Sequence, residues 1–185
     1  MRFIETPVAG VCIVELDPIE DARGSFARAF ATDQMREAGL FDTVVHVNIS
    51  TNETPGTLRG MHWQDEPCPD PKIVRCTRGA IFDVAVDLRP DSPTYLSWTG
   101  QRLDAETRKS LHVPAGCAHG FITLEPGSDV LYLMGAPFEP DLARGIRWDD
   151  PAVGVDWPLP PAVISQRDAS YPDLPVLPDL PHPSP

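Results

Sequence analysis

The chain has 185 residues and a mass of 20.3 kDa, and 42% of the residues are hydrophobic, which fits one domain with a sizeable core. Its 27 acidic and 15 basic residues give a formal net charge of -12, which argues against nucleic acid and against an anionic membrane as partners. No apolar run reaches the roughly 18 residues of a spanning helix, and the N-terminus lacks the features of a secretory signal. We therefore expect a cytoplasmic protein.

Cysteine spacing and the distribution of charge add two expectations. The four cysteines are widely scattered and include no C-x-x-C pair, which predicts reduced thiols rather than disulfides or a zinc site. Residues 23–78 hold seven basic and seven acidic residues, whereas residues 79–185 hold seven and fifteen. A small anionic ligand is therefore expected to meet the middle of the chain, although most of its basic side chains could equally be solvated surface. These side chains include Arg23, Arg28, Arg59, Lys72, Arg75 and Arg78.

The predicted elements are mostly strands. A helix is predicted over 33–40, where DQMREAGL contains Gly39 near its end, and alternation of period two predicts strands over 43–49, 72–76, 80–87 and 130–134. Because strands and helices do not alternate, a parallel α/β fold is disfavoured and an all-β sandwich, jelly roll or barrel is predicted. Residues 1–172 are expected to form one domain. The Pro-rich segment 173–185 is expected to lie extended over it or to be disordered.

Two segments combine histidine with turn residues. In residues 56–64, GTLRGMHWQ, a regular strand would point Arg59 and His62 to opposite faces, but a bulge at Gly60 could bring both to one side. In residues 113–121, VPAGCAHGF, His119 follows a Pro-x-Gly turn at the start of an apolar strand. A single histidine is more often a hydrogen-bonded structural residue than a catalyst, so the two together carry more weight than either alone.

Gly-x5-His followed by Pro-x-Gly-x-x-His resembles the two signatures of the cupin superfamily, which implies a β jelly roll, or double-stranded β-helix. Many cupins bind a metal through a His-x-His motif, but here Gln64 stands in place of the second histidine. His62 and His119 are then the only certain ligands, and a transition-metal site of this kind usually needs three or more. A metal site is therefore the weaker interpretation.

A narrower resemblance spans nearly the whole chain apart from its Pro-rich end. The ordered motifs are DARGSF at 21–26, NIS at 48–50, LRGMHWQ at 58–64, KIV at 72–74, FDVAVDLR at 82–89, SPT at 92–94, VPAG at 113–116, AHGF at 118–121, GIRWDDP at 145–151, DWP at 156–158 and SQRD at 165–168. This series resembles the dTDP-4-dehydrorhamnose 3,5-epimerase family. The resemblance implies a cofactor-independent epimerase, without a metal, that acts beside the C4 ketone of a nucleotide-linked 4-keto-6-deoxyhexose, and it implies a homodimer.

The chemistry of that reaction needs a base, a group that stabilises the enolate, and an acid on the opposite face of the ring. The resemblance implies His62 as the base, Asp168 as its carboxylate partner, Lys72 as the cation facing the keto oxygen, and Tyr132 as the proton donor. Period two places Lys72 on the face of Val74, so Lys72 points into the barrel if Val74 faces the core, and caps the strand end in solvent otherwise. From the residues alone, Asp168 would be a surface acid and Tyr132 a core tyrosine.

The resemblance also implies a set of substrate-binding residues. Arg23, Arg59 and His119 match positions that contact the nucleotide sugar, Asn48 matches one near the base, and Phe138 falls where an aromatic ring stacks on thymine. Three positions of this set depart from the family pattern: Arg28 and Ala143 stand in place of glutamates, and His46 in place of a glutamine. These departures suggest a different nucleotide sugar, or epimerisation of one carbon rather than two. The alternatives are a metal-dependent cupin oxygenase or isomerase and a non-catalytic sugar-binding jelly roll.

Overall fold

The body of the molecule is formed by two facing β-sheets. The structure, a computed structural model, describes residues 1–174. The strands are β1 (Arg2–Glu5), β2 (Cys12–Glu15), β3 (Ile19–Asp21), β4 (Gly24–Phe26), β5 (His46–Asn52), β6 (Thr57–Gln64), β7 (Lys72–Arg78), β8 (Ala80–Asp87), β9 (Trp98–Asp104), β10 (Ser110–Val113), β11 (Cys117–Thr123), β12 (Ser128–Met134), β13 (Ala143–Gly145) and β14 (Val163–Ile164). The helices are α1 (Thr32–Glu37) and α2 (Gln166–Ala169).

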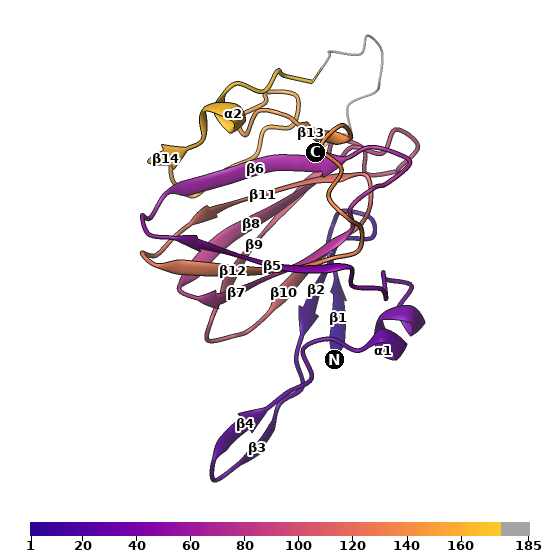
Figure 1. Cartoon of the computed structure of the whole chain (residues 1–185), viewed down its shortest axis with the longest axis vertical. Helices are drawn as coiled ribbons and strands as arrows, with labels where there is room; N and C mark the ends of the chain where they lie inside the picture. The colour runs from indigo at the N-terminus through magenta and orange to yellow at the C-terminus, as the bar shows by residue number, and fades with distance from the viewer. Residues whose placement is uncertain (175–185) are drawn as a thin grey trace.

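The strand order identifies the architecture. The first sheet has the order β1-β2-β10-β7-β12-β5, and the second has the order β13-β6-β11-β8-β9, with β14 pairing in parallel with β6 (Figure 1). All other pairings are antiparallel, and strands distant in sequence lie side by side in both sheets. This arrangement confirms the predicted all-β, cupin-type jelly roll.

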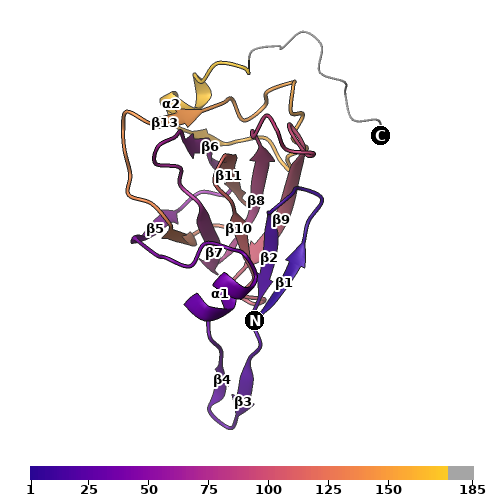
Figure 2. The same ribbon diagram turned by 90° about the vertical axis from the view of Figure 1, so that its right-hand side faces the viewer.

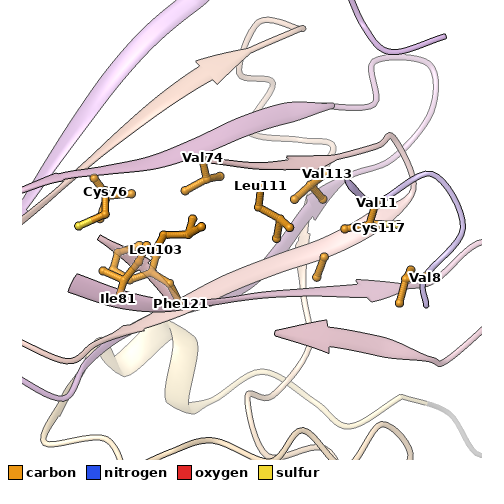
Figure 3. Close-up of a cluster of buried hydrophobic side chains, with 12 residues drawn as sticks. Val8, Val11, Val74, Cys76, Ile81, Leu103, Leu111, Val113, Cys117 and Phe121 are labelled. Carbon is orange, nitrogen blue, oxygen red and sulfur yellow. The ribbon is translucent and has the colours of Figure 1, made fainter. Parts of the chain in front are cut away.

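The main core lies between the two sheets. Figure 3 shows Val74 and Cys76 of β7 on one side and Ile81 of β8 and Phe121 of β11 on the other, all of them buried. Alternate side chains of β7 therefore face the core, as period two predicted. Because Lys72 has the parity of Val74, the same alternation turns Lys72 inward, where it is 4% exposed.

The outer faces of the two sheets differ. The C-terminal segment covers the outside of the β6-β11-β8-β9 sheet, where Trp157 packs with Val84 and Ala118 in a second apolar cluster. By contrast, Val47 and Ile49 of β5, an edge strand of the other sheet, are largely exposed. The β3–β4 hairpin projects away from the body and exposes Phe26 (Figures 1 and 2).

Several sequence expectations need correction or qualification. The helix expected over 33–40 begins at Thr32 and ends at Glu37, and the strand expected over 43–49 runs from His46 to Asn52. A second helix, α2, was not predicted. It has only four residues, which are too few to show the hydrophobic periodicity of a helix. All four cysteines are free. No helix within residues 1–174 is long and apolar enough to cross a membrane. The expectation for the end of the Pro-rich segment falls on 175–185, outside the described residues.

Candidate active site

A cavity of about 670 Å³ opens between the two sheets and is partly closed by α2. Strands β6 and β11 line it from one sheet, and β5, β7 and β12 line it from the other. Eight of the residues selected from the sequence lie together on its wall. They are Asn48, Arg59, His62, Lys72, His119, Tyr132, Phe138 and Asp168.

The bulge at Gly60 places Arg59 and His62 on the same cavity. His119 pairs with His62, whereas Phe121 pairs with Arg59, so three residue steps on β6 oppose two on β11. Gly60 has φ +133, and a Cβ there would lie 2.5 Å from the Cα of Gly120. Only glycine fits this backbone. The bulge predicted from the sequence is confirmed.

His62 is paired with a carboxylate from the other end of the chain. Its Nε2 lies 2.8 Å from Oδ1 of Asp168, 106 residues later, and Oδ2 of Asp168 accepts a hydrogen bond of 3.2 Å from the backbone N–H of Gly60. Burial acts to raise the pKa of Asp168, but the hydrogen bonds from His62, Gly60 and Ser165 and the charge of His62 outweigh it and leave the pKa below its ordinary 3.8. An ionised Asp168 accepts from Nε2–H, which leaves Nδ1 of His62 as the basic nitrogen.

Helix α2 explains how Asp168 reaches the cavity. Ser165 caps the helix, and its hydroxyl accepts the backbone N–H of Asp168. Tyr171, just after the helix, lies edge-on against His62 with 5.9 Å between ring centroids. The pattern Ser-x-x-Asp at 165–168 is the sequence signal of such a cap, and it could have placed this helix.

Lys72 is buried but not alone. Its Nζ donates a 2.7 Å hydrogen bond to Oδ2 of Asp70, and both residues line the cavity. The inward direction of Lys72 agrees with the expectation from its place on the face of Val74, and the alternative of a strand end in solvent is wrong. The neighbouring carboxylate of Asp70 makes burial of the charge tolerable.

Tyr132 and His119 meet across the cavity from opposite sheets. Their rings are edge to face, with centroids 6.1 Å apart. Nε2 of His119 lies 2.8 Å from Oδ1 of Asp83, which is fully buried. Burial, followed by the charge of Asp83, raises the pKa of Tyr132 above its ordinary 10.0, and a hydrogen bond with Ser50 opposes the rise. Tyr132 therefore stays a neutral phenol at physiological pH.

The cavity also carries cations suited to an anionic ligand. Arg59 donates through Nε to Oδ1 of Asn52 at 2.8 Å and makes no ion pair with an acid of the described residues. Arg167 of α2 also lines the cavity, and its guanidinium lies 5.7 Å from the centre of the Tyr171 ring. Arg167 was not among the site residues predicted from the sequence, although it directly precedes Asp168. Phe138 is largely exposed at the rim.

Three of the expected binding residues lie outside the cavity lining. Arg23 is in the turn of the projecting hairpin, 90% exposed and paired with Asp21. Arg28 follows that hairpin and His46 begins β5, and both are exposed. Ala143, the third departure from the family pattern, does line the cavity.

Gln64, which stands in place of the second histidine of the metal-binding motif, is engaged by the backbone. Its Nε2 donates to the carbonyl oxygens of Cys68 and Pro137, and its Oε1 accepts the N–H of Glu139 at 2.7 Å. Among residues 1–174, no group of three or more His, Cys, Asp or Glu side chains has a metal-binding arrangement.

The chain is similar in sequence and fold to proteins described as epimerases of deoxysugars. A family model described as dTDP-4-dehydrorhamnose 3,5-epimerase matches residues 5–175. Proteins of that name from Sinorhizobium fredii and Methanothermobacter thermautotrophicus are 42% and 43% identical, over 96% and 94% of this chain and 92% and 94% of their own. A crystal structure of the protein of that name from Bacillus anthracis, with TDP and PPi bound, has a TM-score of 0.89 and 35% identity, over 94% of this chain and 99% of that one.

Proposed function

Because the chain belongs to the dTDP-4-dehydrorhamnose 3,5-epimerase family, it is an isomerase of a nucleotide-linked keto sugar, and we propose that it epimerises both carbons beside the C4 ketone of a dTDP-linked 4-keto-6-deoxyhexose. The observation that carries this proposal is the placement of His62 and Tyr132. They lie on facing sheets and line one cavity, and His62 is backed by Asp168.

His62 is the proposed base. A proton on a carbon next to a ketone is weakly acidic, and a positioned imidazole can remove it. Nδ1 accepts the proton, and Asp168 stabilises the imidazolium that forms while it holds the ring through Nε2. His62 is 42% exposed, so it can release the proton to water afterwards.

Lys72 is the proposed enolate stabiliser. Its ammonium lies in a nearly dry part of the cavity, where a positive charge counts for more than in water. Asp70 keeps that charge in place before substrate binds. As the carbonyl oxygen gains negative charge, it receives a hydrogen bond from the lysine.

Tyr132 is the proposed acid. It stands on the sheet opposite His62, so it faces the other side of a sugar ring held between them. Its raised pKa keeps the proton on the phenol until the enolate carbon accepts it. Removal from one face and return on the other inverts the carbon without a cofactor.

The nucleotide diphosphate is proposed to bind along the cations at the open side of the cavity. Arg59 and Arg167 can each make paired hydrogen bonds to phosphate oxygens. Asn48 and the exposed ring of Phe138 offer a hydrogen-bonding group and a stacking surface to the base. The principal alternative is that the protein acts on a different sugar or nucleotide, or epimerises one carbon. The departures from the family pattern at Arg28, His46 and Ala143 support this alternative.

A homodimer would give the hairpin a role. Phe26 on the hairpin and Val47 and Ile49 on β5 expose apolar surface that a second copy can cover. Strand β5 also lines the cavity. We propose that the hairpin of one protomer packs beside β5 of its partner and brings Arg23 and Arg28 to the partner's substrate. The enzyme is proposed to work in the cytoplasm.

Solvent exchange tests the reaction. Wild-type protein in deuterated water with dTDP-4-keto-6-deoxyglucose is expected to incorporate deuterium at both carbons beside the ketone, measured by mass spectrometry and NMR. Exchange at one carbon would identify a monoepimerase, and binding without exchange would identify a sugar-binding protein. Stoichiometric bound metal with activity lost to a chelator would support the metal-dependent alternative.

Hybrid dimers test the hairpin. His62→Ala and Arg23→Ala proteins are each expected to turn over slowly, but their mixture should recover activity after subunit exchange. In a mixed dimer, the site with an intact His62 receives the intact Arg23 of the other protomer. No recovery in mixed dimers confirmed by native mass spectrometry would show that Arg23 does not act across the interface.

A further inference from the structure

Asp83 is a buried carboxylate to which the mechanism above gives no task. Ile81, Asp83 and Ala85 share the face of β8 that points into the main core, and Asp83 is fully buried. Its Oδ2 has no hydrogen-bond partner among the described residues. A buried carboxylate is costly even when it is paired, and an apolar residue of similar size would usually stabilise the fold more. Its presence in the core therefore calls for a functional reason.

His119 connects Asp83 to the cavity. Nε2 of His119 pairs with Asp83 at 2.8 Å, and no hydrogen bond within residues 1–174 engages Nδ1. The ring lines the cavity and stands edge to face with Tyr132. Asp83, His119 and Tyr132 thus form a continuous series from the core to the cavity. Burial raises the pKa of Asp83, while the charges of His119 and Lys72 oppose the rise, so the carboxylate favours a proton on or beside it.

Counting protons shows what such a pair can supply. Inversion of two carbons in one bound sugar requires two proton donations, but the phenol of Tyr132 carries one proton. After the first donation the phenolate is partly buried and lies near the carboxylate of Asp83, where a second negative charge is unfavourable. It must regain a proton before the second carbon can be inverted.

We infer that the Asp83–His119 pair returns a proton to Tyr132 between the two epimerisations of one bound substrate, with Asp83 as a positioning residue that acts through His119. The inference rests on the double epimerisation proposed above. The N–H bond at Nδ1 of His119 breaks and the O–H bond of Tyr132 forms, directly or through one water molecule. The proton between Nε2 and Oδ1 stays on the imidazole, so the pair goes from neutral to a net charge of -1, and it regains a proton from water after product leaves.

The test compares the two carbons within one turnover. Wild-type and Asp83→Asn proteins, in excess over dTDP-4-keto-6-deoxyglucose, are mixed with deuterated water and quenched over time. Mass spectrometry and NMR then follow deuterium at each carbon. Asparagine keeps the size of the side chain but removes its negative charge, which supports the proton on His119. We expect the first exchange to change by less than about threefold and the second to slow by at least about tenfold, so that singly labelled sugar accumulates.

Asp87→Asn is the matched control. Asp87 is a second fully buried carboxylate on the same strand, but it binds Arg89, Ser92 and Thr94 and does not line the cavity. The Asp87→Asn variant should leave the ratio of the two exchange rates at the wild-type value. If Asp83→Asn does not fold, as judged by circular dichroism, His119→Gln should lower the ratio of the second exchange rate to the first, whatever its effect on the first, because it removes the proton carrier and leaves Asp83.

The outcomes separate this inference from the function beneath it. If wild-type protein incorporates deuterium at neither carbon, the proposed epimerisation itself is wrong. Wild-type protein that exchanges one carbon, or variants in which both exchanges slow equally or neither slows, would overturn the proton return while leaving an epimerase. Selective loss of the second exchange in Asp83→Asn or His119→Gln supports it.

Discussion

The cavity is lined by two histidines, each paired with an aspartate through the same contact but in very different surroundings. In each pair, Nε2 of the histidine lies 2.8 Å from Oδ1 of the aspartate. The side chains of His62 and Asp168 are 42% and 7% exposed, whereas those of His119 and Asp83 are 6% and 0% exposed. The first aspartate comes from a helix at the far end of the chain, and the second from the strand next to its histidine.

The difference shows that access to water separates the roles of two pairs with similar geometry. A base must discharge its proton to solvent before it can act again, and His62 can do so. A group that stores a proton for use inside the closed site is better shielded from solvent, as His119 is. Charge in a buried pair is also less screened and acts more strongly on its neighbours, which is consistent with the influence of Asp83 on Tyr132.

The largest expected effect is at the exposed pair. His62→Ala should lower turnover by about 10³- to 10⁴-fold, because no other imidazole at that position can take the proton. Steady-state kinetics measures the loss, and circular dichroism should show an unchanged fold. A folded variant with wild-type turnover would show that the exposed pair does not supply the base.

The second-largest effect is expected for Tyr132→Phe, with a loss of about 10²- to 10³-fold in turnover and little change in KM. The ring still packs against His119, but the acid is gone. Proton removal by His62 should persist. Loss of deuterium from substrate labelled beside the ketone is therefore expected to outpace product formation, and equal slowing of both would contradict the separation of base and acid.

Asp168→Asn should cost about 10²-fold in turnover, less than loss of the imidazole itself. The amide can still hold the ring, but it does not stabilise the imidazolium, and it can favour the wrong tautomer. The acid limb of the pH–rate profile tests this directly, because a negative partner stabilises the protonated imidazole of His62, and removal of that partner lets the base stay unprotonated at lower pH. An unmoved limb, or one that moves to higher pH, would show that Asp168 is not that partner. With Asp168 as the partner, the limb moves to lower pH.

The smallest effect is expected at Asp87, a buried carboxylate with no histidine. Burial would raise its pKa, but hydrogen bonds from Arg89, Ser92 and Thr94 lower it to about 2 from its ordinary 3.8. A carboxyl whose pKa is lower in the folded state stabilises the fold above the unfolded pKa, and this contribution is lost as pH falls from about 4 to about 2. It amounts to roughly 2 kcal/mol at neutral pH.

Urea unfolding of Asp87→Asn should therefore show a loss of stability at pH 7 that shrinks toward pH 2. Turnover per folded molecule should match the wild type. A stability difference that stays constant with pH would show that the charge of Asp87 is not responsible, and a selective loss of the second exchange would show that its position resembles that of Asp83.

The strands were predictable wherever alternation was strong. Residues 80–87 form β8 with the predicted bounds, and Lys72 follows Val74 inward because period two leaves only two faces. Boundaries were less certain where a strand lies at an edge, as β5 does, because partner pairing there decides where the strand begins. Helix α2 was not predicted, because a four-residue helix is defined by its cap and shows no hydrophobic periodicity.

The sequence alone determined the fold class, the pair of histidines, and the bulge at Gly60, since these depend on local alternation, turn residues and backbone freedom. The pairing of Asp168 with His62 was expected only through the family resemblance, because the residues alone indicated a surface acid. The tertiary structure alone decided that Asp70 neutralises Lys72, that Asp83 lies behind His119, and that Arg23 stands away from the cavity of its own chain. The physical reason is that period two fixes which way a side chain points, whereas strand order and the path of the C-terminal segment fix what it meets.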